Sequence, residues 1–171
     1  MGEGARGTMI LRRSAVLLAT AILLTIAGCS FLGEQGPELT YLEPALSPDG
    51  RRLAYESAVD GKLDLFARDI ETGVAERLTE NQADDFSPSW SPDGTSIVFA
   101  SNRNNNVDIY ILDLATHQTR RLTTDAGTDM NPTWAADGRI YFNSDRTQAW
   151  QIYAVLPDGT SLAAITAPAT P

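Results

Sequence analysis

The sequence predicts an all-β fold made of three four-stranded propeller blades. Two single-residue markers recur at one interval of 44 residues: Pro44, Pro88 and Pro132, and Gly50, Gly94 and Gly138. The dipeptide Leu78-Thr79 returns 44 residues later as Leu122-Thr123 and 43 further on as Ile165-Thr166. A period of about 40–50 residues that holds four short strands is typical of propeller blades.

The first blade is expected at about residues 41–84. Its first turn is Ser47-Pro48-Asp49-Gly50, in which serine caps the turn, proline presets φ and glycine accepts a left-handed conformation. Apolar strands are predicted at 53–55 and 63–66, and a last strand at 76–79. Leu46 stands where the later blades carry tryptophan, so this blade has a smaller inner anchor.

The second blade, at about 85–128, is the best formed, with its turn at 91–94 and strands at 97–99, 108–111 and 120–123. The third blade, at about 129–166, keeps the turn glycine but has Ala135-Ala136 where the others have Ser-Pro. Residues 167–171 are expected to form a short frayed tail.

The repeated pattern resembles a known family. Pro88-x-Trp90-Ser-Pro-Asp-Gly, a short apolar strand, Asp108-Ile-Tyr and Arg120-Arg-Leu-Thr are similar to the TolB-type β-propeller repeat, over essentially all of 41–166. The resemblance implies blades arranged around a channel and acting as a binding platform. Related repeats form the propeller of prolyl-oligopeptidase-type peptidases. The sequence shows neither the family's N-terminal α/β domain nor a hydrolase domain, so the family's partners are not inherited automatically.

The front of the chain reads as an export signal. Arg12-Arg13 precede an uncharged run that ends in Ile26-Ala27-Gly28-Cys29, which resembles a bacterial lipoprotein signal. The resemblance implies a signal peptide at 1–28, a lipid on Cys29 and a tether at 29–40, and hence an exported protein anchored to the cell envelope. An uncleaved anchor helix with a buried cysteine is the alternative.

Charge disfavours nucleic-acid partners. The formal net charge is −9, and removing residues 1–28 takes away three arginines and one glutamate, which leaves −11. Such a surface repels nucleic acid and suits soluble or cationic partners.

The residues of common catalytic centres are missing. His117 is the only histidine and falls in a turn, which excludes a histidine-based metal site within one chain and leaves the serines without a base. The segment 104–108 has oxygen ligands but one carboxylate, fewer than calcium usually takes. We therefore expect no enzyme activity, no metal and no cofactor.

Strand direction divides the loops between two rims. In a meander, the turns after the first and third strands share one rim, which here has stereotyped turn sequences. The loops after the second strand and the links between blades share the other, where variable loops on a rigid frame favour binding. The candidate partner-binding residues on that rim are Asp84, Asp85, Asn102, Arg103, Asn105, Asp129, Asp145, Arg146 and Trp150.

Two interpretations of this rim stay open. The repeated Asp85/Asp129 and Arg103/Arg146 most simply form ion pairs between blades, with ligand contact as the alternative. Trp150 either contacts a partner or tucks under a neighbouring blade.

The sequence therefore predicts a non-enzymatic envelope lipoprotein that binds protein or cell-envelope glycan. The alternatives are a propeller fragment or regulatory module of a secreted peptidase or glycan-active enzyme, and a structural assembly module. Closed propellers have 4–8 blades. Three blades could be completed by a homodimer with six, belong to a longer propeller, or form an open arc that another protein completes.

Overall fold

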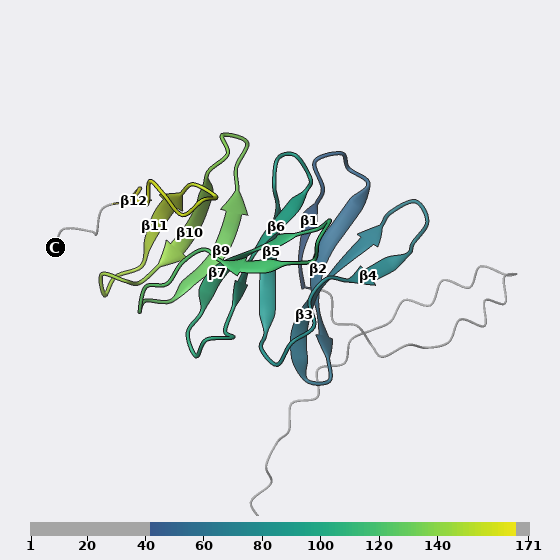
Figure 1. The fold of residues 1–171 in the computed structure, drawn as a ribbon, viewed down its shortest axis with the longest axis horizontal. Helices are drawn as coiled ribbons and strands as arrows, with labels where there is room; N and C mark the ends of the chain where they lie inside the picture. The colour runs from purple at the N-terminus through teal and green to yellow at the C-terminus, as the bar shows by residue number, and fades with distance from the viewer. Residues whose placement is uncertain (1–41, 167–171) are drawn as a thin grey trace, which may run out of the picture. The chain divides into compact units, whose positions relative to one another are not determined.

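The computed structural model describes residues 42–166, which form twelve β-strands and no helix (Figure 1). The strands make three four-stranded antiparallel sheets in sequence order, so the predicted all-β fold of three blades is confirmed. The predicted signal peptide, Cys29, the tether and the 167–171 tail lie outside the described residues.

Each sheet is one blade, and its strands run in order from inner to outer. Blade 1 contains β1 (Leu42–Leu46), β2 (Arg52–Val59), β3 (Lys62–Asp69) and β4 (Ala75–Arg77). Blade 2 contains β5 (Asp85–Trp90), β6 (Ser96–Ser101), β7 (Asp108–Asp113) and β8 (Thr119–Arg121). Blade 3 contains β9 (Asp129–Trp134), β10 (Ile140–Ser144), β11 (Gln151–Val155) and β12 (Ala163–Ala164).

The turn between the first two strands has the geometry that its sequence predicts. In blade 1 the Gly50 amide donates to the Ser47 carbonyl at 2.9 Å, and the Ser47 hydroxyl donates to the Asp49 carboxylate at 2.6 Å. This hydroxyl bond lowers the pKa of Asp49. In blade 3, which lacks the serine, the Arg139 amide and the Tyr141 hydroxyl donate to the Asp137 carboxylate.

A bulge in the first strand of every blade was not predicted. The pairing register shifts inside β1, β5 and β9, where Glu43, Ser87 and Asn131 have φ values of 45°, 53° and 52°. Each of the three precedes one of the repeated prolines. The bulge re-aims the backbone, so that the Ser87 amide donates to the buried Glu56 carboxylate of blade 1 at 2.7 Å.

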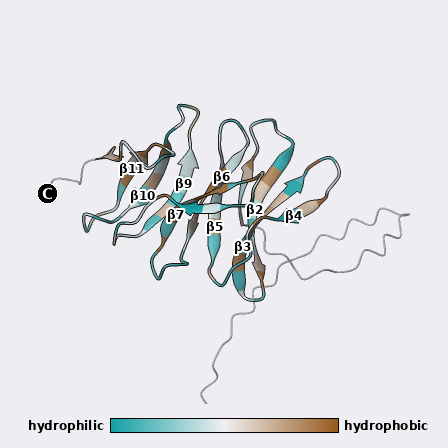
Figure 2. Cartoon of the chain, viewed as in Figure 1, coloured by the Kyte–Doolittle hydropathy of each residue, from teal (hydrophilic) through white to brown (hydrophobic). Residues whose placement is uncertain are grey.

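Both faces of blade 2 are apolar because it is packed between two neighbours. Side chains alternate between the faces of a strand. Ile97, Phe99, Tyr110 and Leu112 face blade 1, and we call this side the leading face of the blade. The opposite side, here called the trailing face, carries Val98, Ala100, Ile109 and Ile111 and packs against blade 3. Figure 2 shows hydrophobic stretches in the strands and hydrophilic residues in most connecting loops.

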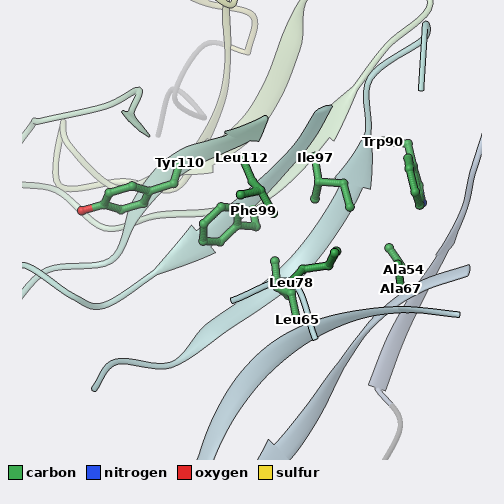
Figure 3. Packing of buried hydrophobic residues seen from close by; sticks show 9 residues of the cluster. All are labelled: Ala54, Leu65, Ala67, Leu78, Trp90, Ile97, Phe99, Tyr110 and Leu112. Carbon is green, nitrogen blue, oxygen red and sulfur yellow. The ribbon is translucent and has the colours of Figure 1, made fainter. Parts of the chain in front are cut away.

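The junction of blades 1 and 2 shows how the faces interlock. Phe99 and Ile97 of blade 2 point toward Leu65 and Leu78 of blade 1 (Figure 3). Trp90 closes the inner end of this layer, where its indole N–H donates to the Ala45 carbonyl at 2.9 Å. Burying a large apolar side chain stabilises a fold by about 1.5–3 kcal/mol, so the junctions are a main source of stability.

Trp90 of blade 2 and Leu46 of blade 1 occupy equivalent positions but should contribute very different amounts to the free energy of unfolding. Trp90→Ala removes a 6% exposed side chain from the junction, and we expect it to lower the free energy of unfolding by about 3–5 kcal/mol. Leu46→Ala is the matched control at the equivalent position, where the side chain is 57% exposed, and should cost less than about 0.5 kcal/mol. Equilibrium urea unfolding measures both, and equal losses would contradict the packing described.

Candidate functional site

The loops after the second strands and the links between blades do share one rim, as the strand order requires. Asp84, Asn102, Arg103 and Asn105 gather there around the start of blade 2, and a groove of 740 Å³ opens beside them. Asp145 and Arg146 occupy the equivalent loop of blade 3.

Asp85 and Arg103 form the first repeated ion pair. Asp85 is fully buried, and Nη2 of Arg103 donates to both carboxylate oxygens of Asp85, at 2.8 and 3.0 Å. The Arg103 guanidinium also lies over the Tyr110 ring at 4.5 Å. Asn81 supplies a further N–H bond to Asp85 at 2.6 Å.

Blade 3 repeats this arrangement. Arg146 donates to both oxygens of the buried Asp129 at 3.0 Å and lies 4.5 Å from the Tyr153 ring centre. Gly127 leaves room for Arg146, because a Cβ at Gly127 would meet its backbone at 2.6 Å.

The predicted ion pairs therefore form, but the prediction that they link two blades is wrong. Asp85 and Arg103 both belong to blade 2, and Asp129 and Arg146 both belong to blade 3. The reason is that the aspartate opens the first strand, and this strand pairs with the second strand, whose end carries the arginine.

A second repeated pair was missed by sequence reasoning. Arg77 contacts the fully buried Asp64 at 2.6 Å, and Arg121 contacts the fully buried Asp108 at 2.7 Å. The signal was present in the sequence, because the aspartate and the arginine are 13 residues apart in both blades. Blade 3 has Gln151 and Ala164 at these positions, so both charges are absent together.

The two kinds of pair meet at the blade junctions. Burial raises the pKa of Asp64, and the charge of Asp85 in the next blade raises it further, while Arg77 opposes the rise. Burial likewise raises the pKa of Asp108, with Asp129 adding to the effect. Each internal junction therefore holds two carboxylates from adjacent blades, each with its own guanidinium.

Two further predicted residues are occupied by internal contacts. Asp84 accepts hydrogen bonds from the Leu63 amide at 3.0 Å and from the Asn102 side chain at 2.9 Å. Asp84 therefore links the β2–β3 hairpin of blade 1 to the loop after β6 in blade 2. Asp145, in the equivalent loop of blade 3, accepts a bond at 2.6 Å from the amide of Thr128 in the link before that blade.

The groove beside this network is lined mainly by amide side chains. Its lining residues are Asn81, Gln82, Ala83, Asn102, Arg103, Asn105, Asn106, Val107 and Thr128. Most of the amides are held by internal bonds, as when Asn106 donates to the Asp125 and Gly127 carbonyls. Gln82 and Asn105 are exposed, and neither side chain makes a hydrogen bond to another described residue. Asn105 was among the residues predicted from the sequence, whereas Gln82, which is in a link between blades, was not.

Trp150 lies apart from this groove. It is 56% exposed and lines a 460 Å³ hollow together with Met130, Asn143, Gln151, Ile152 and Thr166. All of these belong to blade 3, the last blade described.

Among residues 42–166, no group of three or more histidine, cysteine or acidic side chains is placed to hold a metal ion. His117 is half exposed in the turn between β7 and β8, with Nε2 3.6 Å from the Glu76 carboxylate. No helix in the described part of the chain is long and apolar enough to span a bilayer.

Three consecutive meander sheets with buried junctions define a β-propeller repeat protein. Residues 35–170 match the model of the TolB beta propeller domain, so the chain belongs to the TolB β-propeller family.

Solved structures agree with this assignment. TolB from Acinetobacter baumannii is 33% identical over 76% of this chain and 33% of its own, with a TM-score of 0.69. A putative TolB from Agrobacterium tumefaciens is 34% identical over 74% of this chain and 46% of its own, with a TM-score of 0.70. The chain thus spans a third to under half of these proteins.

A likeness to a puromycin hydrolase shows the fold alone. That structure is 21% identical over 73% of this chain and 22% of its own, with a TM-score of 0.60.

The Asp108–Arg121 pair of blade 2 should tolerate the loss of both charges better than the loss of one, because blade 3 has the neutral Gln151 and Ala164 at the equivalent positions. Arg121→Ala leaves Asp108 buried without its guanidinium, and we expect a loss of about 3 kcal/mol in the free energy of unfolding at neutral pH. Adding Asp108→Gln copies the neutral pair of blade 3 and should recover at least about half of that loss. Urea unfolding of the two single variants and the double variant measures the coupling, and a double variant less stable than Arg121→Ala would contradict the account.

The loss of stability caused by Arg121→Ala should also depend on pH. In Arg121→Ala, burial keeps the pKa of Asp108 above its ordinary value of 3.8, so the folded protein binds a proton more tightly than the unfolded chain. The folded state gains stability as pH falls toward this raised pKa and loses it as pH rises through it. The destabilisation by Arg121→Ala should therefore shrink in acid, and an unchanged loss would show that no buried charge is involved.

Proposed function

We propose that this chain is a non-enzymatic envelope lipoprotein whose blades bind a protein partner through the amide-lined groove. The observation that supports this most is the pair of exposed amides, Gln82 and Asn105, beside a network whose other members are fixed by internal bonds. A groove of this kind presents both donors and acceptors on a rigid frame, which suits the backbone of a peptide segment.

The electrostatics of the groove favour a partner without strong negative charge. Arg103 lines the groove, but Asp85 compensates its charge at 2.8 Å. The chain as a whole carries −9, which steers cationic partners toward it and repels polyanions. Membership of the TolB β-propeller family supports a protein partner as well.

An envelope location follows from the proposed processing of the front of the chain. A lipid on Cys29 and the tether at 29–40 would hold the blades close to the membrane surface, with the groove free to meet other envelope proteins. The likeness to TolB proteins supports a periplasmic or extracellular face. Under this proposal no residue acts on a substrate.

The groove is tested by crosslinking in a living bacterium. We expect a photoreactive amino acid at Gln82 to capture a protein partner, and the same group at Gln118, an exposed amide in a turn of the opposite rim, to capture none. Gln82→Ala should then weaken binding of the purified partner about tenfold without changing the unfolding midpoint.

The controls separate the parts of the proposal. Cys29→Ser should move the protein from the membrane fraction to the soluble fraction while the purified partner still binds. Equal capture from both rims would contradict the groove as the site. Retention of the full-length protein on purified peptidoglycan, with no protein captured at Gln82, would show a glycan partner instead.

A further inference from the structure

The leading face of blade 3 has alanine at a position where blade 2 has a long cationic side chain. In blade 2, Arg121 stands opposite Tyr110 in the β7–β8 pairing, and Tyr110 faces blade 1. In blade 3, Ala164 stands opposite Tyr153 in the equivalent β11–β12 pairing, and Tyr153 faces blade 2. Residues opposite each other in neighbouring strands share a face of the sheet. A methyl group therefore takes the place of the arginine at the junction of blades 2 and 3.

A hollow of 290 Å³ opens at the same junction. Its apolar walls are Leu122, which follows β8 of blade 2, and Val155 and Leu162 of blade 3. Leu162 is 47% exposed, so this wall can be reached from solvent. Gly159 also lines the hollow, and a Cβ at Gly159 would meet nothing within 4 Å. The hollow therefore has room and apolar contact for the aliphatic stem of a long side chain that enters from outside.

The charges that line the hollow favour a cation. Arg146 is 10% exposed, and its charge is compensated by Asp129 at 3.0 Å. Asp125 is exposed, and its Oδ1 accepts the Gly127 amide at 2.9 Å, while its carboxylate forms no ion pair with another described residue. Thr124 adds an exposed hydroxyl next to Asp125. One uncompensated negative charge remains, on a chain whose net charge of −9 also attracts cations.

We propose that this hollow binds an arginine side chain of a protein partner. The stem of the arginine lies against Leu122 and Leu162, and its guanidinium bonds Asp125 and Thr124. Arginine fits because its planar guanidinium presents several N–H donors to a carboxylate and a hydroxyl at once. The hollow shares no lining residue with the amide-lined groove, so the proposal does not depend on the function proposed for the groove.

NMR of the full-length protein in detergent, with labelled leucine and valine methyl groups, tests the site with N-acetyl-arginine methylamide as the probe. We expect saturable shifts of the Leu122, Val155 and Leu162 methyl signals, with a dissociation constant of about 1 mM for a ligand of this size. N-acetyl-citrulline methylamide is the matched probe, because it has nearly the same shape and no charge. It should bind at least about threefold more weakly.

Filling the hollow should abolish binding. The double variant Gln151→Asp/Ala164→Arg copies onto blade 3 the Asp108–Arg121 pair of blade 2, so that the added arginine has its own carboxylate. We expect no saturable shift of the three methyl signals in this variant. Circular dichroism and urea unfolding show whether it is folded.

Removing the charge should weaken binding without a change in the fold. Asp125→Asn keeps an oxygen for the Gly127 amide, and we expect it to weaken binding of the arginine probe about threefold. Asp60→Asn is the matched control, because Asp60 is an exposed aspartate in the β2–β3 turn of blade 1, and this variant should bind as the unsubstituted protein does.

Four results would overturn the proposal. They are the absence of saturable shifts in the unsubstituted protein, equal binding of the arginine and citrulline probes, equal binding by Asp125→Asn and Asp60→Asn, and binding by a folded double variant. Because Asp125 is exposed, its substitution tests the site even if the double variant does not fold.

Discussion

The structure depends on apolar sheet faces that cannot be covered within one blade. Blade 2 has Phe99 on one face and Ile109 on the other, both fully buried, and each is covered only by an adjacent blade. A four-stranded sheet alone would expose both faces, so the repeats stabilise one another as neighbours do in other repeat proteins. This constraint holds the blades side by side, and the strand order within each blade then brings the variable loops to one rim.

Buried carboxylates add a second constraint at the same junctions. Asp64 and Asp85 come from different blades, and each has its own arginine, because two unpaired carboxylates in a buried junction would be costly. The rim around the groove is held in this way by an interlocked polar network. The neutral Gln151 and Ala164 of blade 3 fit the same rule, since losing the aspartate and the arginine together leaves no buried charge unpaired.

Much of the fold could be predicted from the sequence, because the turns and apolar strands carry their own local signals. Gly94 marks a turn by its need for positive φ, and its value of 71° agrees. The bulges could not be predicted, because Glu43 and Ser87 are ordinary residues before proline and only the pairing register shows their left-handed backbone. The ion pairs were predicted from spacing, but spacing does not show whether two side chains belong to one sheet or to two. Gln82 was missed because a single amide in a link carries no pattern.

Amide hydrogen exchange in a Phe142→Ala variant tests the mutual dependence of the blades most directly. Phe142 is 1% exposed and packs from blade 3 against Ile109 and Ile111 of blade 2. If the faces stabilise one another, exchange should accelerate in β6 and β7 of blade 2 as well as in β10 and β11, with a smaller change in β2 and β3 of blade 1. Acceleration confined to blade 3 would show that each blade is stable alone, and this would contradict the account.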